Sequence, residues 1–192
     1  MAIKIQETFQ VDAPIDVVWR FVMDPQRVAA CMPGAALEEV IDDRTYLGNI
    51  TVKVGAITTS YKGEVKLTEV DEASYTVEMA AAGRETGGGT AKGTMASRLR
   101  SLPDGQTEVV AEATVDLAGR IMQVGRGMIQ GVSHQLFLQF VGCAKSSLEA
   151  PDGTIDQNVV NAPPEPIRIV PLVLRTIWAA ITRLFSRPQG PA

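Results

Sequence analysis

The chain is poor in the side chains that most often carry catalysis. Its 192 residues include one histidine, His134, and two cysteines, Cys31 and Cys143. His134 falls on the outer side of a predicted helix, which leaves a serine or cysteine nucleophile without an obvious acid–base partner. The cysteines do not show the paired spacing of a metal site. We therefore expect no catalytic residues, no metal site and no enzymatic activity.

The cysteines and the start of the chain also bear on location. We expect Cys31 and Cys143 to be buried free thiols, with a single disulfide between them as the alternative. The opening residues 1–4 show no basic start, apolar stretch or cleavage site, and they lead directly into an alternating strand pattern. These features predict that the protein has no signal peptide and is cytoplasmic.

Charge is distributed unevenly along the chain. The net charge is −4, but all 22 acidic residues lie at or before Glu165, and only arginines follow among the charged residues. By count, the body of the chain carries about −8 and the tail about +4. An acidic body argues against nucleic acid as a partner. A basic, apolar tail favours an anionic membrane surface instead.

The spacing of apolar residues predicts one domain over residues 1–149. Apolar residues alternate over 3–11, and the prolines within 14–31 fit two short helices. From 37 to 117 the period is two, in runs separated by turn residues, which predicts an antiparallel meander. From 121 to about 148 the period is that of a helix. The whole pattern indicates the α+β class.

This order of elements matches the helix-grip, or START-like, fold. A curved antiparallel seven-stranded sheet is expected to wrap around the long C-terminal helix, whose apolar stripe covers it. The stripe comprises Ile121, Val124, Met128, Val132, Leu136, Phe140 and Cys143.

Small residues interrupt the apolar faces of the sheet and of the long helix. They are Gly63, Ala91, Gly93, Ala111 and Ala113 on inward strand positions, and Gly125, Gly127 and Gly131 in the helix. Glycine inside a helix costs about 1 kcal/mol relative to alanine. The pattern therefore indicates either a close approach of helix and sheet or an empty volume, and the sequence leaves both open.

Several polar side chains are expected on the apolar side, where each needs a partner. Gln135 and Gln139 lean toward the apolar side of the helix, and Tyr46, Tyr61 and Tyr75 are predicted to point inward. The carboxylates of the strands, with the exception of Glu7, alternate outward and indicate a solvated face. The glycine-rich run 83–90 is interpreted as a hairpin loop, because a strand follows it instead of the helix that a phosphate-binding loop requires.

The C-terminal part is predicted to be a proline-rich linker, 150–166, followed by a basic amphipathic helix, 167–187. Within this predicted helix the longest charge-free run, 176–182, has only seven residues. A spanning helix would bury Arg175 at a cost of roughly 2.5–3.5 kcal/mol, whereas a helix in the membrane surface avoids that cost. The alternative is that the tail helix packs on the domain or on a partner. The predicted membrane contacts are Arg168, Leu172, Arg175, Trp178, Ile181, Arg183 and Phe185.

A set of short motifs resembles one family over roughly residues 3–147. The motifs are Trp19-Arg20-Phe21, Asp24-Pro25, Cys31-Met32-Pro33-Gly34, Lys53-Val54-Gly55, Tyr61-Lys62-Gly63, Gly87-Gly88-Gly89-Thr90-Ala91, Gly119-Arg120-Ile121 and Phe140-Val141-Gly142-Cys143. In combination they resemble the G-subunit family of carbon monoxide dehydrogenase, which is part of the START-like, polyketide-cyclase-like SRPBCC superfamily. Members of that superfamily hold apolar ligands between the sheet and the long helix.

The resemblance implies a non-catalytic accessory role beside a molybdenum-containing carbon monoxide dehydrogenase or a related molybdenum hydroxylase. The partners it implies are that enzyme complex, an anionic membrane surface at the inner face of the cell membrane, and an apolar small molecule. No cofactor is expected apart from a bound quinone, which would link the enzyme to the respiratory chain by electron transfer. The predicted ligand-binding residues are Val52, Val54, Tyr61, Met79, Met95, Val115, Met128, Leu136, Gln139 and Phe140.

Two further interpretations remain beside this lipid-binding function. The protein can instead be an adaptor or maturation factor for the dehydrogenase without a bound ligand. A START-like cyclase or hydrolase is less favoured, because no inward acid–base group stands out.

Deleting residues 167–192 is expected to leave a folded domain and to move the protein from the membrane fraction to the soluble fraction, because the linker separates the tail from the domain. Cosedimentation with lipid vesicles measures this, and a truncated protein that still sediments would contradict membrane attachment by the tail. Arg168→Glu, Arg175→Glu and Arg183→Glu together should weaken binding to anionic vesicles more than to neutral ones.

Overall fold

The computed structural model describes residues 2–149, so the predicted linker and the predicted tail helix lie outside the described residues. The elements are β1 (Ala2–Val11), α1 (Ile15–Val22), α2 (Pro25–Cys31), β2 (Ala35–Asp42), β3 (Thr45–Val54), β4 (Ile57–Asp71), β5 (Thr76–Glu85), β6 (Thr90–Ser101), β7 (Thr107–Ala118), the short 3-10 helix η1 (Arg120–Val124) and α3 (Arg126–Glu149).

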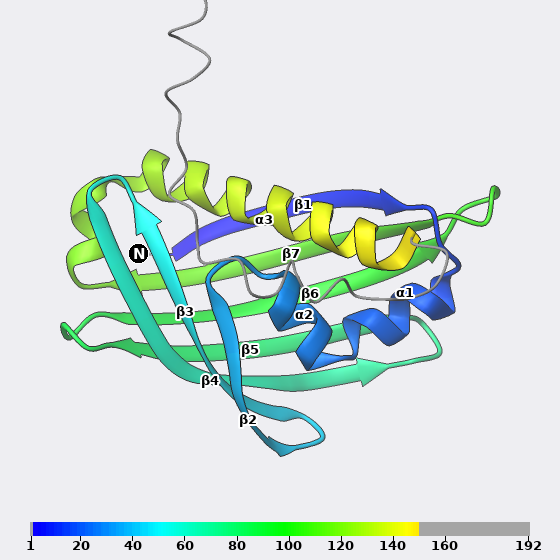
Figure 1. The fold of residues 1–192 in the computed structure, drawn as a ribbon, viewed down its shortest axis with the longest axis horizontal. Helices are drawn as coiled ribbons and strands as arrows, with labels where there is room; N and C mark the ends of the chain where they lie inside the picture. The colour runs from blue at the N-terminus through cyan, green and yellow to red at the C-terminus, as the bar shows by residue number, and fades with distance from the viewer. Residues whose placement is uncertain (1, 150–192) are drawn as a thin grey trace, which may run out of the picture. The chain divides into compact units, whose positions relative to one another are not determined.

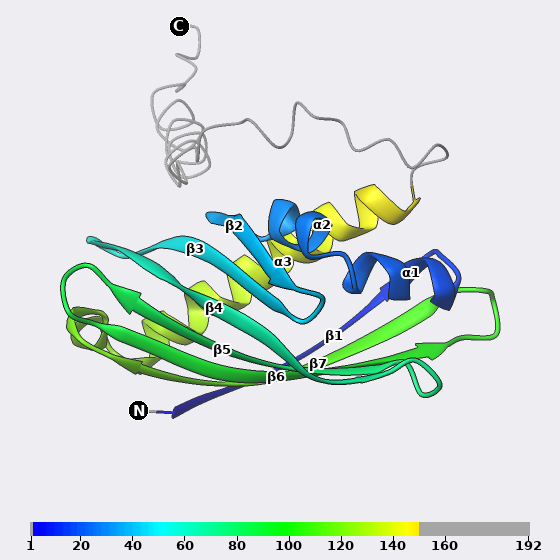
Figure 2. The same cartoon turned by 90° about the horizontal axis from the view of Figure 1, so that it is seen from below.

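The strands form one seven-stranded antiparallel sheet in the order β1-β7-β6-β5-β4-β3-β2. Strands β2 to β7 therefore run as a meander, and the first strand closes it by pairing with the last. The sheet is curved, and the three α-helices lie on its concave face (Figures 1 and 2). The helix-grip fold predicted from the sequence is confirmed.

Alternation along the strands places apolar side chains on the concave face, where they form separate clusters. At one end, Val18 and Trp19 of α1 pack against sheet residues that include Leu67, Val77 and Leu99. A second cluster brings Ile121 and Ile129 onto Ile3, Val54 and Leu117. A third joins Phe21 of α1 to Cys31 and to Ala144 of α3. The core is thus divided, and its clusters hold the helices against the two ends of the sheet.

A row of glycines crosses three neighbouring strands. Gly48 pairs with Gly63, and Gly63 pairs with Gly83. A Cβ added at Gly63 would lie 2.1 Å from the carbonyl oxygen of Ala82, and one added at Gly48 would lie 2.6 Å from that of Ala36. Because real Cβ atoms do not approach backbone oxygens so closely, the strands can follow this path only with glycine at these positions.

The long helix starts later than the sequence predicts. A continuous helix from Ile121 is wrong, because η1 ends at Val124 and Gly125 adopts a φ of 83° before α3 begins. This break changes the helical phase, so the fully buried positions of α3 are Ile129 and Ala144. Met128, expected on the inward stripe, is 49% exposed.

The two cysteines form a disulfide, so the expectation of free thiols is wrong. Cys31 ends α2 and Cys143 lies on α3, and their Cα atoms are 5.3 Å apart. The sequence separation of 112 residues carries no sign of this proximity, which results from α2 packing against α3.

Replacing Cys31 and Cys143 together by alanine is expected to lower the free energy of unfolding by about 2–4 kcal/mol, because the crosslink closes a long loop and restricts the unfolded chain. Denaturant titration in oxidising buffer measures this. The wild-type protein treated with a thiol reductant should lose a similar amount, and equal midpoints for oxidised wild type and the double variant would contradict the disulfide.

Candidate functional site

The concave face holds an open pocket of about 470 Å³. Its floor consists of inward residues from strands β3 to β7, and its other walls come from the end of α1, from α2 and from β2. Among the residues that line it, Leu67 and Met79 belong to the cluster beneath α1, whereas Ala91 and Val115 belong to the cluster beneath η1 and α3. The pocket therefore borders both sheet clusters.

The pocket exists because the middle of the sheet carries almost no side chains. The inward positions at its floor include Gly48, Gly63, Ala81, Gly83, Ala91, Gly93 and Ala113. A pleated sheet with large residues there would fill the space beneath the helices. Of the two interpretations of the small residues, the empty volume is the one that the strand positions bear out.

The glycines of the long helix, unlike the small residues of the sheet, do not line the pocket. A Cβ added at Gly127 or Gly131 would meet no atom within 4 Å, so neither glycine is required for a close approach of helix and sheet. Gly125 is different, because its positive φ allows the chain to turn from η1 into α3.

Four of the predicted ligand-binding residues line the pocket, namely Tyr61, Met79, Met95 and Val115. The other six are placed elsewhere. They are Val52 and Val54 in the cluster beneath η1 and α3, Met128 at the surface beside Gly55, Leu136 partly buried on α3, Gln139 exposed on α3, and Phe140 beside Phe21.

The four misplaced residues of α3 share one cause. We expected α3 to roof the pocket, but the described wall is supplied by α2 and β2 instead. Val28, Ala29 and Met32 of this segment were missed. A short helix that covers part of a sheet leaves no long periodic pattern, and only the folded structure shows which face it contacts.

The three tyrosines differ in where their hydroxyl groups lie. Tyr46 lines the pocket and donates a hydrogen bond to the Asp43 carbonyl oxygen at 2.7 Å. Tyr75 lies before β5 with a φ of 50°, and its hydroxyl group donates to the Asp16 carboxylate. Its ring packs inward, edge-on against Trp19 of the core, as predicted. Tyr61 lines the pocket, and its buried hydroxyl group has no partner among the described residues.

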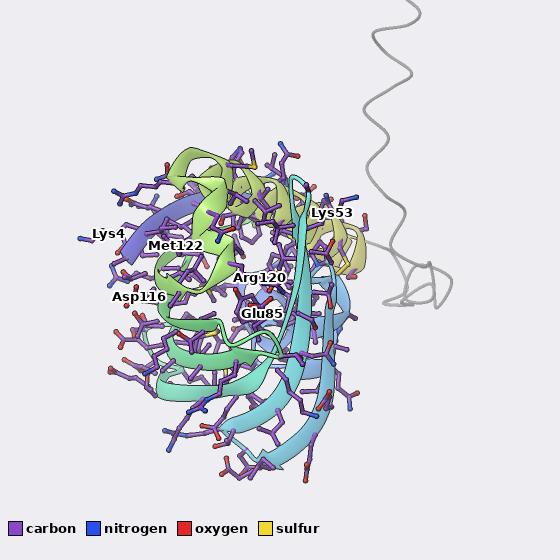
Figure 3. All side chains as sticks on the ribbon, turned by 90° about the vertical axis from the view of Figure 1, so that its left-hand side faces the viewer. Lys4, Lys53, Glu85, Asp116, Arg120 and Met122 are labelled. Atoms are coloured by element: carbon purple, nitrogen blue, oxygen red, sulfur yellow. A yellow bond between two sulfur atoms is a disulfide. The ribbon has the colours of Figure 1, made fainter. Side chains whose placement is uncertain are left out.

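An ion pair beside the pocket joins a buried carboxylate to an exposed arginine. The Glu85 side chain is 5% exposed, and the Arg120 guanidinium, from η1, donates to its Oε1 at 3.1 Å. The Arg120 side chain is itself 64% exposed, and Figure 3 shows it beside Glu85, whereas Lys4, Lys53 and Asp116 point outward. Glu85 falls in the predicted loop 83–90, whereas in the structure it is the last residue of β5 and in phase with the inward residues of that strand.

The neighbours of Glu85 favour its charged form. The Thr59 hydroxyl, although outside strict hydrogen-bond geometry, contributes most to lowering the pKa of Glu85, and Arg120 adds to it. Desolvation opposes both. Turn residue Gly89 packs tightly against this carboxylate, since an added Cβ there would lie 2.6 Å from Oε2. The predicted loop 83–90 is a hairpin turn only over 86–89, because 83–85 end β5 and Thr90 begins β6, and Gly89 of the turn covers the carboxylate.

Glu7, the other carboxylate on the inward side of the sheet, is paired with His134 of α3. Glu7 of β1 accepts a hydrogen bond from Nδ1 of His134 on α3 at 2.7 Å. His134 is exposed, as expected, and its partner lies outside the pocket wall. Gln135 is exposed as well, so it does not turn toward the sheet as predicted.

Residues 8–149 match the family described as the G subunit of carbon monoxide dehydrogenase (CoxG). The chain belongs to the CoxG family. No curated protein sequence matches this chain. Within residues 2–149, no helix has both the length and the hydropathy of a membrane-spanning segment.

Solved structures with a similar fold extend the comparison. A conserved protein from Geobacillus kaustophilus aligns with a TM-score of 0.70 at 18% identity over 77% of this chain and 95% of that one. The ZhuI aromatase/cyclase from Streptomyces sp. R1128 aligns at 0.57 and 17% identity, over 78% and 94% of the two chains. A START superfamily protein from Mycobacterium smegmatis aligns at 0.50 and 12%, over 76% and 97%. These likenesses show that this CoxG protein has the START-like fold, which hosts enzymes as well as binding proteins.

Glu85→Gln is expected to destabilise the protein at neutral pH, with a difference that shrinks in acid. Because the folded pKa of Glu85 lies below its ordinary value of 4.5, its charge stabilises the fold above that pH and loses this effect as the pH falls through the folded pKa. Thermal unfolding of both proteins across this range measures the difference. Glu112→Gln, at an exposed position of β7, is the matched control, and a wild-type advantage that stays constant into acid would contradict the assignment.

Proposed function

We propose that this CoxG protein is a non-catalytic accessory protein of a molybdenum-containing carbon monoxide dehydrogenase. In this proposal it binds a lipophilic molecule, a quinone, in the pocket and recruits the enzyme to the membrane, which links the enzyme to the respiratory chain. Family membership supports the association with the dehydrogenase. The predicted membrane helix, 167–187, lies outside the described residues, and its truncation tests the recruitment.

The observation that carries the proposal is the pocket itself. Its volume of about 470 Å³ is within the range of roughly 300–1,000 Å³ typical of small-molecule sites. The wall is apolar apart from a few groups, and it includes Met23, Met32, Met79 and Met95. Methionine side chains adapt to flat or flexible guests, so this wall suits a ring system that carries an isoprenoid chain.

The ionisable groups of the wall support binding over catalysis. Apart from tyrosines, the ionisable residues among those described in the wall are Glu64 and Lys92. Both are exposed and occupy outward positions of their strands, between inward neighbours such as Gly63 and Gly93. General acid–base chemistry requires such a group within hydrogen-bond reach of the reacting atom. This wall is instead arranged to hold a guest.

Ala81→Phe is the variant expected to block the pocket. Ala81 is an inward residue of β5 on the pocket floor, yet it is exposed, so a phenyl ring there would occupy space meant for the guest. We expect roughly tenfold weaker quinone binding, or about 1.4 kcal/mol, with an unfolding temperature close to that of the wild type. The matched control is Ala80→Phe, the next residue of β5, which lies on the opposite face and does not line the pocket.

The measurements are equilibrium titration of the purified full-length protein with a prenylated naphthoquinone, and mass spectrometry of solvent extracts for a copurified quinone. Wild-type protein that neither binds nor copurifies with a quinone would favour an adaptor without a ligand. If Ala81→Phe unfolds the domain while Ala80→Phe does not, this region is tightly packed core, and the pocket is not a binding site.

A further inference from the structure

One hydroxyl group in the pocket wall lacks a partner. Tyr61 is 6% exposed, and its hydroxyl oxygen is buried without a hydrogen bond among the described residues. Buried side chains with polar atoms in the same condition include Arg27, Thr59 and Glu85, but Tyr61 is the one of these that lines the pocket. Burial of an unpaired hydroxyl group is unfavourable, so a native structure with one calls for an explanation.

The other tyrosine of the wall shows what a satisfied phenol looks like in the same setting. The Tyr46 hydroxyl donates to the Asp43 carbonyl oxygen at 2.7 Å and is thus already occupied. Both tyrosines are on the concave face, Tyr46 on β3 and Tyr61 on β4. Of the two tyrosines in the described wall, Tyr61 is therefore the one whose hydroxyl group is unpaired.

The surroundings of Tyr61 favour a neutral acceptor. Its direct register partner on β5 is Glu85, whose negative charge is already balanced by Arg120. Lys92, the cationic residue of the described wall, occupies an exposed outward position. An anionic ligand such as a carboxylate or a phosphate would lose its hydration on binding near Tyr61. It would find no unpaired positive charge there, so its binding would be unfavourable. A carbonyl oxygen needs only a hydrogen-bond donor.

We propose that the Tyr61 hydroxyl group is the specificity-determining contact of the pocket, which donates a hydrogen bond to a carbonyl oxygen of a neutral ring ligand. This inference rests on the proposed function and narrows the ligand class to molecules that combine an apolar body with an uncharged acceptor. Shape and apolar area then determine how tightly the apolar body of the ligand binds, and Tyr61 determines the orientation of the ligand, with its carbonyl oxygen toward the hydroxyl group. Prenylated quinones have this chemistry, whereas hydrocarbons of the same shape do not.

The test is a thermodynamic cycle between one hydroxyl group and one pair of carbonyl groups. Wild type and Tyr61→Phe are titrated with a prenylated naphthoquinone and with a naphthalene that carries the same chain without the carbonyl groups. A net hydrogen bond corresponds to a roughly three- to tenfold change in affinity. We therefore expect Tyr61→Phe to weaken naphthoquinone binding by that factor and to leave binding of the naphthalene unchanged.

A second measurement distinguishes a recognition role from a structural one. In the free protein the Tyr61 hydroxyl has no partner to lose, so Tyr61→Phe should unfold at the same temperature as wild type or at a higher one. The matched control is Tyr75→Phe, which removes a hydroxyl that donates to Asp16 outside the pocket wall. That variant should unfold at a lower temperature and bind both ligands as wild type does.

The outcomes separate this inference from the proposed function. Equal naphthoquinone affinity in wild type and Tyr61→Phe, or an equal loss for both ligands, would overturn the role of Tyr61 while the quinone site itself remains. Wild-type protein that binds neither ligand would overturn the proposed function, and this inference with it. A clear drop in the unfolding temperature of free Tyr61→Phe would show that its hydroxyl group has a structural partner, which also overturns the inference.

Discussion

The scarcity of side chains in the middle of the sheet is the constraint on which the rest of the structure depends. Backbone atoms of β2 and β5 approach Gly48 and Gly63 so closely that no Cβ fits, and the neighbouring floor positions carry hydrogen or methyl groups. Because the centre cannot be packed, the apolar core is divided into clusters at the ends. The helices rest on those clusters and span the space between them.

That arrangement gives α2 a larger role than its length suggests. It covers part of the pocket through Val28 and Ala29, with Met32 directly after it, and its last residue, Cys31, is bonded to α3. The long helix contributes no described residue to the pocket wall, but it holds α2 through the disulfide and contacts α1 where Phe140 lies against Phe21. The part of the pocket wall that α2 supplies thus depends on a distant element of the sequence, α3, for its position.

The sequence predicted the fold well because alternation and helical periodicity extend over many residues. It identified the floor of the site from inward strand positions such as Met79, Met95 and Val115, since period two fixes which face a residue occupies. It failed where position depended on a single backbone angle or on long-range proximity. The φ of Gly125 changed the phase of α3 and moved Met128 to the surface, and the Cys31–Cys143 bond joins residues 112 apart. Glu85 shows a third kind of failure, because the glycines around it indicated a loop while β5 in fact extends to Glu85, and its partner, Arg120, lies 35 residues further along the chain.

The pairing of the first strand with the last has a consequence for how this domain is made. β1 is synthesised first, yet its partner β7 begins only at Thr107. Likewise, Cys31 can form its disulfide only after Cys143 has been synthesised. An emerging chain therefore exposes an unpaired strand and an incomplete concave face until nearly all of residues 2–149 have left the ribosome. Folding dominated by such distant contacts is slow, and partly made chains with unpaired strands are prone to aggregate. On this topology a nascent chain gains protection from aggregation only when α3 is complete.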